Sequence, residues 1–220
     1  MLLDINPEHP EPRKIARAVD ALASGEVIAY PTDTVYALGC DFNSKKAMER
    51  LYTLKNMPRS HPLALLCADL SNIATYAQVE NQAYRVLRRF LPGPYCFILP
   101  ATREVPKNLL SKQRTIGIRV PASPVTQAMV NALGRPILTT SAGPSGQDAL
   151  IDPKEIDDMF RGLALVLDGG AGGLLPTSVI DLTVDPAVVV RAGVGPVDEF
   201  SDEDPVPNSL RGPYSKRSDR

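Results

Sequence analysis

The sequence predicts an α/β fold with a single twisted, open mixed sheet. Segments with the apolar spacing of helices alternate with short apolar runs typical of strands, and this alternation is characteristic of α/β domains. The last runs follow one another closely, which favours antiparallel pairs added to the sheet. The chain has 220 residues, 44% of them hydrophobic, which is enough for one well-buried core.

The first helix is expected between Pro12 and Gly25, because Ile15, Ala18 and Leu22 recur at helical spacing. Pro92, Gly93 and Pro94 end a later helix sharply. Further helices are expected at residues 44–55, in a short stretch that opens at 69–71, and at 81–91, 123–133 and 153–160.

Strands are expected where short apolar runs are bounded by proline, glycine or polar residues. They are predicted over residues 27–30, 63–67, 95–99, 115–120, 136–140, 164–167, 178–182 and 187–191. Residues 1–9 are interpreted as a lead-in, 10–200 as the domain, and 201–220 as a mobile tail, because this last segment is polar, rich in charges and interrupted by prolines.

Composition argues against several classes of protein. The apolar runs are shorter than a membrane span requires, and the N-terminus lacks the basic and apolar parts of a secretion signal, so we expect a soluble cytoplasmic protein without membrane partners. Cys40, Cys67 and Cys96 are widely spaced in apolar sequence, which indicates reduced core cysteines. Only His9 and His61 are present, so the sequence predicts no protein metal site.

Positive charge is concentrated in residues 45–119. This segment carries thirteen Lys or Arg residues against four acids, a charge of +9, so the rest of the chain carries −10. Such clustering suits a nucleotide triphosphate or an RNA backbone. Part of it has a simpler interpretation, because Arg85, Arg88 and Arg89 fall at helical spacing and are expected to face water.

Polar side chains follow the predicted strand at 27–30. Pro31 cannot extend a central strand, so the backbone is expected to leave the sheet there and to present Thr32, Asp33 and Thr34. Open α/β sheets bind ligands at such strand ends. The alternative is that these residues only cap a turn or a helix.

Two later loops could bind phosphate. Lys55 begins a basic loop stiffened by two prolines, where it could reach a phosphate or complement the dipole of the preceding helix. Residues 138–146 form a strand exit rich in hydroxyls and glycine, where a ligand could approach backbone amides. This loop lacks the Gly-Lys-Ser/Thr ending of a Walker motif, and an ordinary turn remains the alternative.

Two arginines lie in or at the end of apolar strands. Arg119 belongs to the run 115–120, and Arg191 ends the run 187–191. A buried guanidinium without a partner is prohibitive in free energy. Each arginine is therefore expected either to pair with an internal carboxylate or to point into a cleft.

Taken together and in their order along the chain, these turns, loops and strands resemble the YrdC/YciO family. This family includes the threonylcarbamoyl-AMP synthases that begin the formation of a modified adenosine in tRNA. The resemblance covers residues 12 to 200 and is strongest to the YciO branch. It matches a Pro-Thr-acid-Thr turn at 31–34, an Ile-Gly-x-Arg-x-Pro strand at 116–121, a Thr-Ser-Ala loop at 140–142 and a closing Arg-x-Gly at 191–193. It implies a twisted open sheet with a positively charged concave cleft that binds nucleotide or RNA.

The resemblance also implies a reaction and residue roles. In the synthases, threonine whose nitrogen has been carboxylated from bicarbonate attacks the α-phosphate of ATP and expels pyrophosphate, and Mg²⁺ is expected to accompany ATP. Cations would stabilise the phosphate charge, and hydroxyls would orient the amino acid. By resemblance, Lys55 and Arg119 would be catalytic, Thr34 and Ser178 would bind threonine, and Lys55, Arg59, Thr139, Ser141 and Arg191 would bind the nucleotide.

Four positions depart from the synthase pattern: Met57, His61, Leu66 and Gly143. Met57 replaces an arginine, and Arg59 is the cation left to take its place. Losing a guanidinium and two polar side chains costs several kcal/mol of transition-state stabilisation, on the order of several powers of ten in rate.

Two hypotheses follow. The first is a YciO-type protein that binds ATP, AMP or a threonylcarbamoyl-adenylate-like ligand, with weak synthase or related hydrolytic activity. The second is a non-catalytic module that binds double-stranded RNA or tRNA through the exposed basic residues. Aromatic residues make up only 5% of the chain, which offers little stacking surface for bases.

Overall fold

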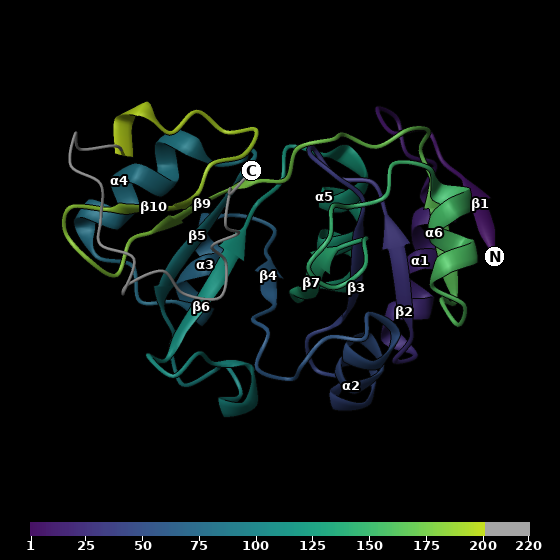
Figure 1. The fold of residues 1–220 in the computed structure, drawn as a ribbon, viewed down its shortest axis with the longest axis horizontal. Helices are drawn as coiled ribbons and strands as arrows, with labels where there is room; N and C mark the ends of the chain where they lie inside the picture. The colour runs from purple at the N-terminus through teal and green to yellow at the C-terminus, as the bar shows by residue number, and fades with distance from the viewer. Residues whose placement is uncertain (201–220) are drawn as a thin grey trace.

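A ten-stranded mixed sheet runs through the described part of the chain (Figure 1). The structure is a computed structural model, and it describes residues 1–200; the predicted tail lies outside this range. The strands are β1 Leu2–Asp4, β2 Val27–Tyr30, β3 Ala37–Asp41, β4 Ala64–Leu66, β5 Tyr95–Pro100, β6 Thr115–Arg119, β7 Ile137–Ser141, β8 Leu165–Asp168, β9 Ser178–Asp181 and β10 Val188–Arg191.

The strand order is β1-β8-β2-β3-β7-β4-β6-β5-β9-β10. Strands β1, β8 and β2 are parallel neighbours, as are β4 with β6 and β5 with β9, and the remaining pairs are antiparallel. The predicted open mixed sheet is therefore confirmed, and so is the antiparallel pairing of the last two strands.

The helices agree with the predicted ones to within a few residues, and they begin at sequence signals for capping. Ser44, Asp69 and Ser123 each accept a hydrogen bond from a backbone N–H in the first turn of their helix. The helices are α1 Pro12–Ala23, α2 Lys45–Leu54, α3 Leu70–Tyr76, α4 Asn81–Phe90, α5 Pro124–Leu133 and α6 Pro153–Met159, with 3₁₀ turns at Lys107–Leu109 and Asp198–Phe200.

Two strands were not predicted. Strand β1 lies within the expected lead-in and pairs with β8 at one edge of the sheet. Strand β3 continues the Pro-Thr-Asp-Thr turn back along β2, so that this turn is the connection of an antiparallel pair. Its Gly39 is required there, because a Cβ would lie 2.7 Å from the Tyr30 hydroxyl and from Ile137.

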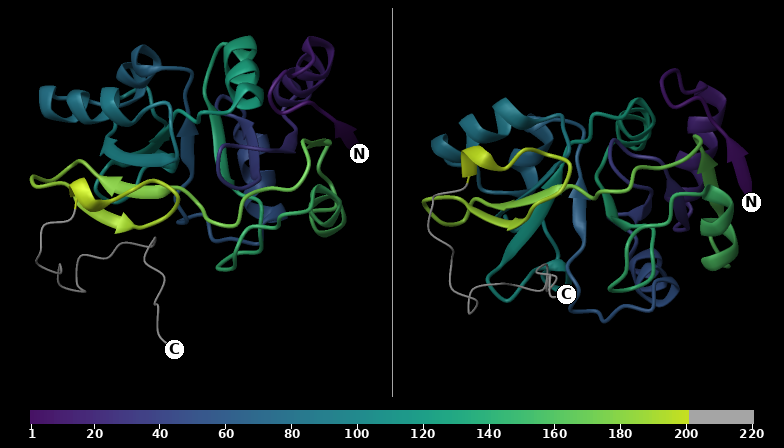
Figure 2. Two further views of the ribbon diagram at one scale, coloured as in Figure 1. Left: turned by 90° about the horizontal axis from the view of Figure 1, so that it is seen from above. Right: turned by 45° about the horizontal axis from the view of Figure 1, so that its top comes forward.

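Helices cover the two faces of the sheet. On one face α1 and α5 pack side by side over a cluster that includes Ile28 and Tyr30 of β2. On the other face α2 and α6 pack over Val27 and Ala29 of the same strand, and α3 and α4 extend this cluster over β5 and β6. Because the sheet twists, α4 and α3 nevertheless lie along the same side of the molecule as α5 and α1 in Figure 2 (left), with α6 opposite.

The core is built as the sequence suggested. All three cysteines are buried and free, and burial raises the pKa of the Cys40 and Cys67 thiols to about 12. These thiols therefore act as small apolar side chains in the core.

Candidate functional site

The turn between β2 and β3 is held by Thr32. Its hydroxyl donates to the Val35 carbonyl at 2.7 Å and accepts from the Thr34 backbone N–H at 3.1 Å. The expectation that these residues cap a turn is thus correct for Thr32. The consequence is a turn of fixed geometry from which Asp33 and Thr34 project.

Asp33 fastens this turn to the neighbouring strand β6. One of its carboxylate oxygens accepts from Nη2 of Arg119 at 3.0 Å, and the other accepts from the Ala122 backbone N–H at 2.9 Å. The two side chains are 8% and 9% exposed, so this is a buried ion pair. Of the two arrangements expected for Arg119, the structure has the pair with an internal carboxylate.

The pairing leaves part of the Arg119 guanidinium unused. Its Nε is buried without a hydrogen-bond partner in the described residues. An unpaired donor of a buried cation is unusual in folded proteins, since such groups almost always have a partner. This N–H is therefore a candidate donor to an acceptor that the protein itself does not supply.

The hydroxyl of Thr34 has limited freedom. It lies 3.2 Å from the Thr32 hydroxyl and 3.4 Å from Nη2 of Arg119. The hydroxyl hydrogen of Thr32 is already donated to the Val35 carbonyl. In the hydrogen bond between the two threonine hydroxyls, Thr34 must therefore be the donor. With its hydrogen used, Thr34 can serve a ligand only as an acceptor, which suits an ammonium group such as that of an amino acid.

Lys55 lies at the end of α2, where the chain turns through Asn56 with a φ of 48°. The side chain reaches across to the end of β7, and its Nζ donates to Thr140 Oγ1 at 2.9 Å, to the Ser141 carbonyl at 2.5 Å and to Ser141 Oγ at 3.1 Å. Lys55 is 5% exposed. None of its three partners is charged.

No carboxylate among the described residues pairs with Lys55, and burial changes the pKa of its ammonium. Desolvation lowers the pKa of Lys55 to about 8. His61 is half-buried, and both burial and the charge of Lys55 lower the pKa of its imidazole. The two basic groups are thus close enough to interact. A nearby anion would stabilise the charged form of both.

The two neighbouring threonines of β7 point in different directions. Thr139 is buried, accepts from the Tyr30 hydroxyl at 2.9 Å and donates to the Leu38 carbonyl at 3.4 Å. Its hydroxyl is therefore fully used in the core, away from Lys55. Thr140, which the sequence did not single out, contacts Lys55 in its place.

Ser178 and Arg191 hold a second turn, near β9 and β10. The Ser178 hydroxyl is completely buried, donates to the Gly195 carbonyl at 2.5 Å and accepts from the Gly193 N–H at 2.9 Å. Arg191 donates through Nε and Nη2 to the Thr177 carbonyl, at 3.1 and 2.8 Å. The structure brings these two side chains together with each other and not with Lys55.

The departures from the synthase pattern have structural reasons. Met57 and Leu66 are buried, Met57 in the core on the α2 side of the sheet and Leu66 in the core beneath α1 and α5. At Gly143 a Cβ would lie 2.1 Å from the Asp148 carbonyl oxygen, so the following loop occupies the space of a side chain. Arg59 is exposed.

A glycine-rich segment, residues 169–177, crosses between the two halves of the sheet (Figure 1). The Tyr36 hydroxyl donates to the Gly170 carbonyl at 2.8 Å and accepts from the Gly169 N–H at 3.0 Å. A Cβ on Gly173 would lie 2.0 Å from the Thr34 carbonyl oxygen. The segment thus packs closely against the Thr34 turn at Gly173. The next residue of the segment, Leu174, is 72% exposed.

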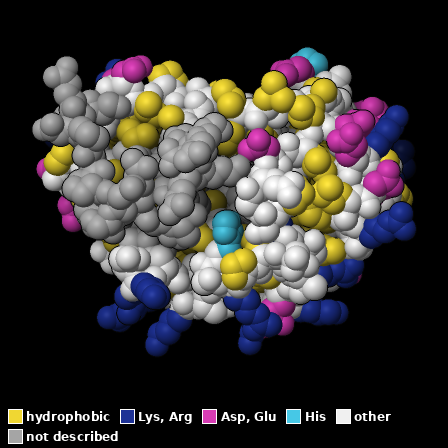
Figure 3. Space-filling model, viewed as in Figure 1, with side chains coloured by type: hydrophobic (Ala, Val, Ile, Leu, Met, Phe, Trp, Pro, Cys, Tyr) yellow, Lys and Arg dark blue, Asp and Glu magenta, His cyan; other side chains and the backbone are white. Residues whose placement is uncertain are grey.

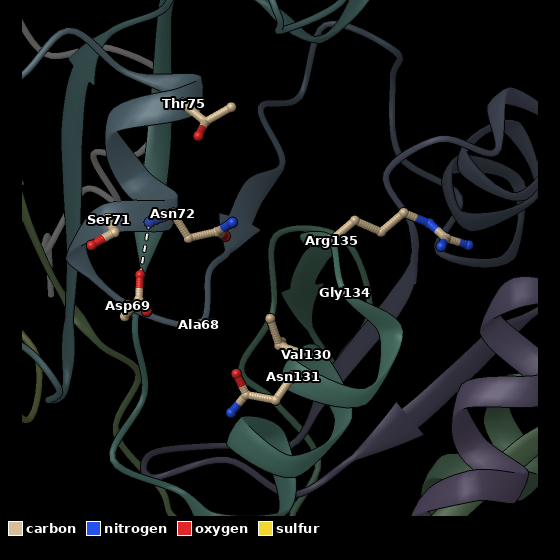
Figure 4. A pocket seen from close by; sticks show the side chains of 9 residues that line it. All are labelled: Ala68, Asp69, Ser71, Asn72, Thr75, Val130, Asn131, Gly134 and Arg135. Carbon is tan, nitrogen blue, oxygen red and sulfur yellow. Dashed lines mark hydrogen bonds between the residues drawn. The ribbon is translucent and has the colours of Figure 1, made fainter.

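A cavity of about 360 Å³ lies between α3 and α5 (Figure 4). Asp69 and Asn72 line one wall, and Asn131, Gly134 and Arg135 line the other. Asp69 caps α3, and Arg135 pairs with Asp41. The charged groups that line this cavity are therefore already paired or already cap a helix.

A second cavity, of about 170 Å³, lies beside Gln82 and Asp185. Neither cavity is lined by Lys55, Thr34 or Arg119, so the predicted basic cleft stays a prediction.

Most of the basic residues of 45–119 lie on the surface. Figure 3 shows Lys and Arg side chains along the lower edge of the molecule, where Figure 1 places α2 and the loop between β5 and β6. The exposed ones are Lys45, Lys46, Arg59, Arg85, Arg88, Arg89, Arg103, Lys107, Lys112 and Arg114. The expectation that Arg85, Arg88 and Arg89 face water is confirmed.

Among residues 1–200, none of the helices combines the length and the apolar character that a membrane span needs. Residues 1–200 also contain no cluster of three or more His, Cys, Asp or Glu side chains able to hold a metal ion.

The candidate site thus consists of two sets: Asp33, Thr34 and Arg119, and Lys55, Thr140 and Ser141. The backbone links them, because Ser141 pairs with Ala37 and the Ala142 N–H donates to the Tyr36 carbonyl, two residues after Thr34. Sequence reasoning missed Thr140 because the face of β7 that reaches Lys55 depends on which strands flank it. Asp33, the partner of Arg119, lies within the Pro-Thr-Asp-Thr turn at 31–34 that the sequence had indicated.

The chain matches the family model Sua5_yciO_yrdC, described as telomere recombination, over residues 20–193. It is 47% identical over 199 residues to the uncharacterized protein YciO of Escherichia coli, covering 89% of this chain and 97% of that protein. A crystal structure of E. coli YciO superposes with a TM-score of 0.87 at 46% identity, covering 91% and 99% of the two chains.

More distant relatives include a synthase. A threonylcarbamoyl-AMP synthase of Pyrococcus abyssi is 30% identical over 196 residues, which cover 88% of this chain and 58% of that protein. The crystal structure of P. abyssi Sua5 complexed with L-threonine superposes with a TM-score of 0.85 at 29% identity, covering 91% of this chain and 59% of that one.

Proposed function

The chain belongs to the Sua5/YciO/YrdC family, and from its candidate site we propose that it binds ATP, AMP or a threonylcarbamoyl-adenylate-like ligand. We further propose a weak reaction on such a ligand, either its synthesis or its hydrolysis. The observation that carries this proposal is the buried ammonium of Lys55, which lies beside two hydroxyls at the end of β7 and has no carboxylate partner within residues 1–200.

An anion at Lys55 would offset the cost of burying its charge. The desolvated ammonium and the neighbouring hydroxyls favour negative charge more strongly than they would in water. A phosphate of the nucleotide is the anion that the family relationship suggests, because relatives include threonylcarbamoyl-AMP synthases. His61, beside Lys55, would add to this preference at low pH.

The second set suits the amino-acid end of the ligand. Thr34 can only accept a hydrogen bond, and the unpaired Nε of Arg119 can only donate one. An amino acid carries an amino group and a carboxylate, which need these two kinds of partner. The complex of P. abyssi Sua5 with L-threonine supports an amino acid of this kind as ligand.

In the synthetic direction, an oxygen of the N-carboxylated threonine attacks the α-phosphate of ATP, and the bond to pyrophosphate breaks. ATP enters this reaction as its Mg²⁺ complex, held by phosphate oxygens and water. The protein contributes binding, orientation and charge stabilisation.

In the hydrolytic direction, water attacks the mixed anhydride, and AMP and N-carboxythreonine are released; the latter loses carbon dioxide to give threonine. This direction needs less stabilisation of a polyphosphate. It therefore fits a site in which Met57 is a core residue and Gly143 leaves no room for a side chain.

The test uses purified protein in two reactions. In the first, ATP, Mg²⁺, bicarbonate and L-threonine are supplied, and the adenylate and pyrophosphate are measured. In the second, threonylcarbamoyl adenylate is supplied, and release of AMP above the uncatalysed rate is measured. We expect turnover in at least one reaction, together with a rise in melting temperature on adding AMP or ATP. Absence of all three effects overturns the proposal.

A second candidate is binding of double-stranded RNA or tRNA without chemistry. It is favoured by the exposed lysines and arginines along one edge of the molecule (Figure 3). These side chains are separate from Lys55, which is buried. The two functions therefore predict different dependences on salt and on substitutions.

A further inference from the structure

The cavity between α3 and α5 is separate from the candidate site. Its volume is about 360 Å³, and none of the residues of the two site sets lines it. Figure 4 shows the Asn72 side chain extending into this space from α3 and the Asn131 side chain extending into it from α5. The Arg135 side chain is turned away from Asn72, and its guanidinium pairs with Asp41. The two helices therefore present amide groups to a space that the candidate site does not use.

One polar atom at this cavity has no partner. Oδ1 of Asn72 is buried and accepts no hydrogen bond within residues 1–200. An acceptor in this state costs free energy in the folded protein, because water no longer hydrates it. Buried polar groups almost always have a partner, so an exception calls for a reason. Since Asn72 lines the cavity, rotation of its amide about the Cβ–Cγ bond would turn Oδ1 toward the open space, where a ligand could donate to it.

The surroundings of this acceptor favour a positively charged donor. One oxygen of Asp69 accepts from the Asn72 backbone N–H at 2.7 Å, and its other oxygen accepts no hydrogen bond in the described part of the chain. The opposite wall is the C-terminal end of α5, which has no basic residue in its last turn and carries the negative pole of the helix dipole. Arg135 is the single cation among the residues lining the cavity, and it is committed to Asp41 and to the Leu133 carbonyl.

We propose that this cavity binds a small primary ammonium compound, whose N–H groups donate to Oδ1 of Asn72 and to the carboxylate of Asp69. An ammonium combines several hydrogens with a positive charge in one group. Its binding gives Asn72 the partner that it lacks and adds a charge-assisted hydrogen bond to Asp69. The cavity has the size of a small-molecule site, for which about 300–1,000 Å³ is usual. The inference concerns a second site and does not rest on the proposed function.

Asn72→Leu separates a role in binding from a role in folding. Leucine has a similar size and no acceptor to leave unpaired, so without ligand we expect a melting temperature equal to or above that of the wild type. The same variant should bind the amine at least about tenfold more weakly. A residue kept only for the fold would show the opposite pattern, with a lower melting temperature and unchanged amine affinity.

The probes are ethanolamine and putrescine, two primary amines, titrated into the full chain by calorimetry at low ionic strength. We expect at least one of them to bind with one-to-one stoichiometry. Asp69→Asn keeps a residue type that caps helices well and removes the charge, so it should weaken binding about tenfold or more. Tetramethylammonium has the charge but no N–H, and should also bind at least about tenfold more weakly.

Two further variants exclude other sites for the amine. Glu104→Gln removes an exposed carboxylate that does not line the cavity, and should leave the affinity unchanged. Thr34→Val removes the acceptor of the candidate site that also suits an ammonium, and should have no effect either.

The inference is overturned if neither amine binds, if tetramethylammonium binds as tightly as the amines, or if Asp69→Asn retains the affinity of the wild type. It is also overturned if Asn72→Leu melts below the wild type, because the amide then serves the fold. Loss of binding in Glu104→Gln or Thr34→Val would move the amine to another place on the molecule and would likewise overturn it.

Discussion

Lys55 is 5% exposed, no carboxylate neutralises it within the described residues, and burial lowers its pKa to about 8. Above this pH the amine is neutral, so its attraction for a phosphate is lost. We expect AMP affinity to fall about tenfold between about pH 7.5 and 9.5. The phosphate of AMP stays dianionic across this range, because its second pKa is about 6.

Stability should change with pH in the opposite sense. The pKa of Lys55 is lower in the folded protein than in the unfolded chain, so between about 8 and 10.5 the unfolded chain binds more protons. The contribution of Lys55 to folding stability therefore rises with pH in this window.

The control for the binding prediction is Lys55→Met, in which the pH dependence of AMP affinity should vanish. An unchanged profile would assign the titration to another group; His61, with its lowered pKa, titrates below the window.

The ion pair between Asp33 and Arg119 is expected to matter more for stability than any exposed pair. Asp33→Ala leaves a buried guanidinium without its partner, which costs about 3 kcal/mol. Adding Arg119→Met removes the lone charge and should recover part of this loss. Chemical denaturation measures both changes.

The matched control is Glu26→Ala, which breaks the exposed pair of Glu26 with Arg50. Such pairs contribute about 0.2–1 kcal/mol. Equal losses for Asp33→Ala and Glu26→Ala would contradict the assignment of a buried pair, as would a double variant less stable than Asp33→Ala alone.

Residue types were a good guide to the turn at Thr32 and a poorer one to the partner of each cation. Arg119 had two open interpretations, and only the tertiary fold shows that Asp33 lies against it. The same holds at Gly143, where composition suggests a lost polar side chain and the structure shows that the Asp148 carbonyl fills the space. These distinctions depend on contacts between segments far apart in the sequence.

The glycine-rich segment 169–177 is an element without regular structure whose packing shapes the site. In Gly173→Ala the new Cβ would lie 2.0 Å from the Thr34 carbonyl oxygen, so the segment must move away from the turn. We expect a loss of about 1–3 kcal/mol, the usual cost of overpacking. The melting temperature of a domain of this size falls by about 2–4 °C for each kcal/mol.

Leu174→Ala provides the control for this segment, because Leu174 is 72% exposed. Its stability should stay within about 0.5 kcal/mol of the wild type. If Gly173→Ala were as stable as Leu174→Ala, the close contact with Thr34 would not hold this segment in place.

At the scale of elements, strong sequence patterns predicted most helices and strands. Two strands, β1 and β3, were not predicted, for identifiable reasons. Strand β3 contains Gly39 and ends at Asp41, residue types that are depleted in strands. Glycine occurs there because the Tyr30 hydroxyl and Ile137 approach the backbone. Strand β1 has only three residues, too few for a periodic pattern.

At the scale of the whole molecule, the sequence predicted an open mixed sheet but not its strand order. The order brings β7 between β3 and β4, and this placement pairs Ser141 with Ala37 of β3 at the end of β7 where Lys55 contacts Thr140. The resemblance to a family supplied the segments of the site. Which hydroxyl of residues 139–141 faces Lys55 followed only from the sheet.

The separation between a buried Lys55 and an exposed basic edge makes the two candidate functions distinguishable. Binding of RNA to exposed lysines and arginines releases counterions, so its affinity falls by powers of ten between about 50 and 200 mM salt when several phosphates are contacted. A nucleotide held at Lys55 is screened much less, because the group is buried. We expect AMP affinity to change by less than about threefold over this range.

Substitutions should separate the functions in the same way. Combining Lys107→Ala, Lys112→Ala and Arg114→Ala removes three exposed charges from the loop between β5 and β6, and should leave AMP binding intact. Lys55→Met should weaken AMP binding about tenfold or more, about 1.4 kcal/mol, and leave any RNA affinity unchanged, because the Lys55 side chain is buried. A steep salt dependence of AMP binding, or loss of AMP affinity in the loop variant, would move the nucleotide to the exposed edge and remove Lys55 from the site.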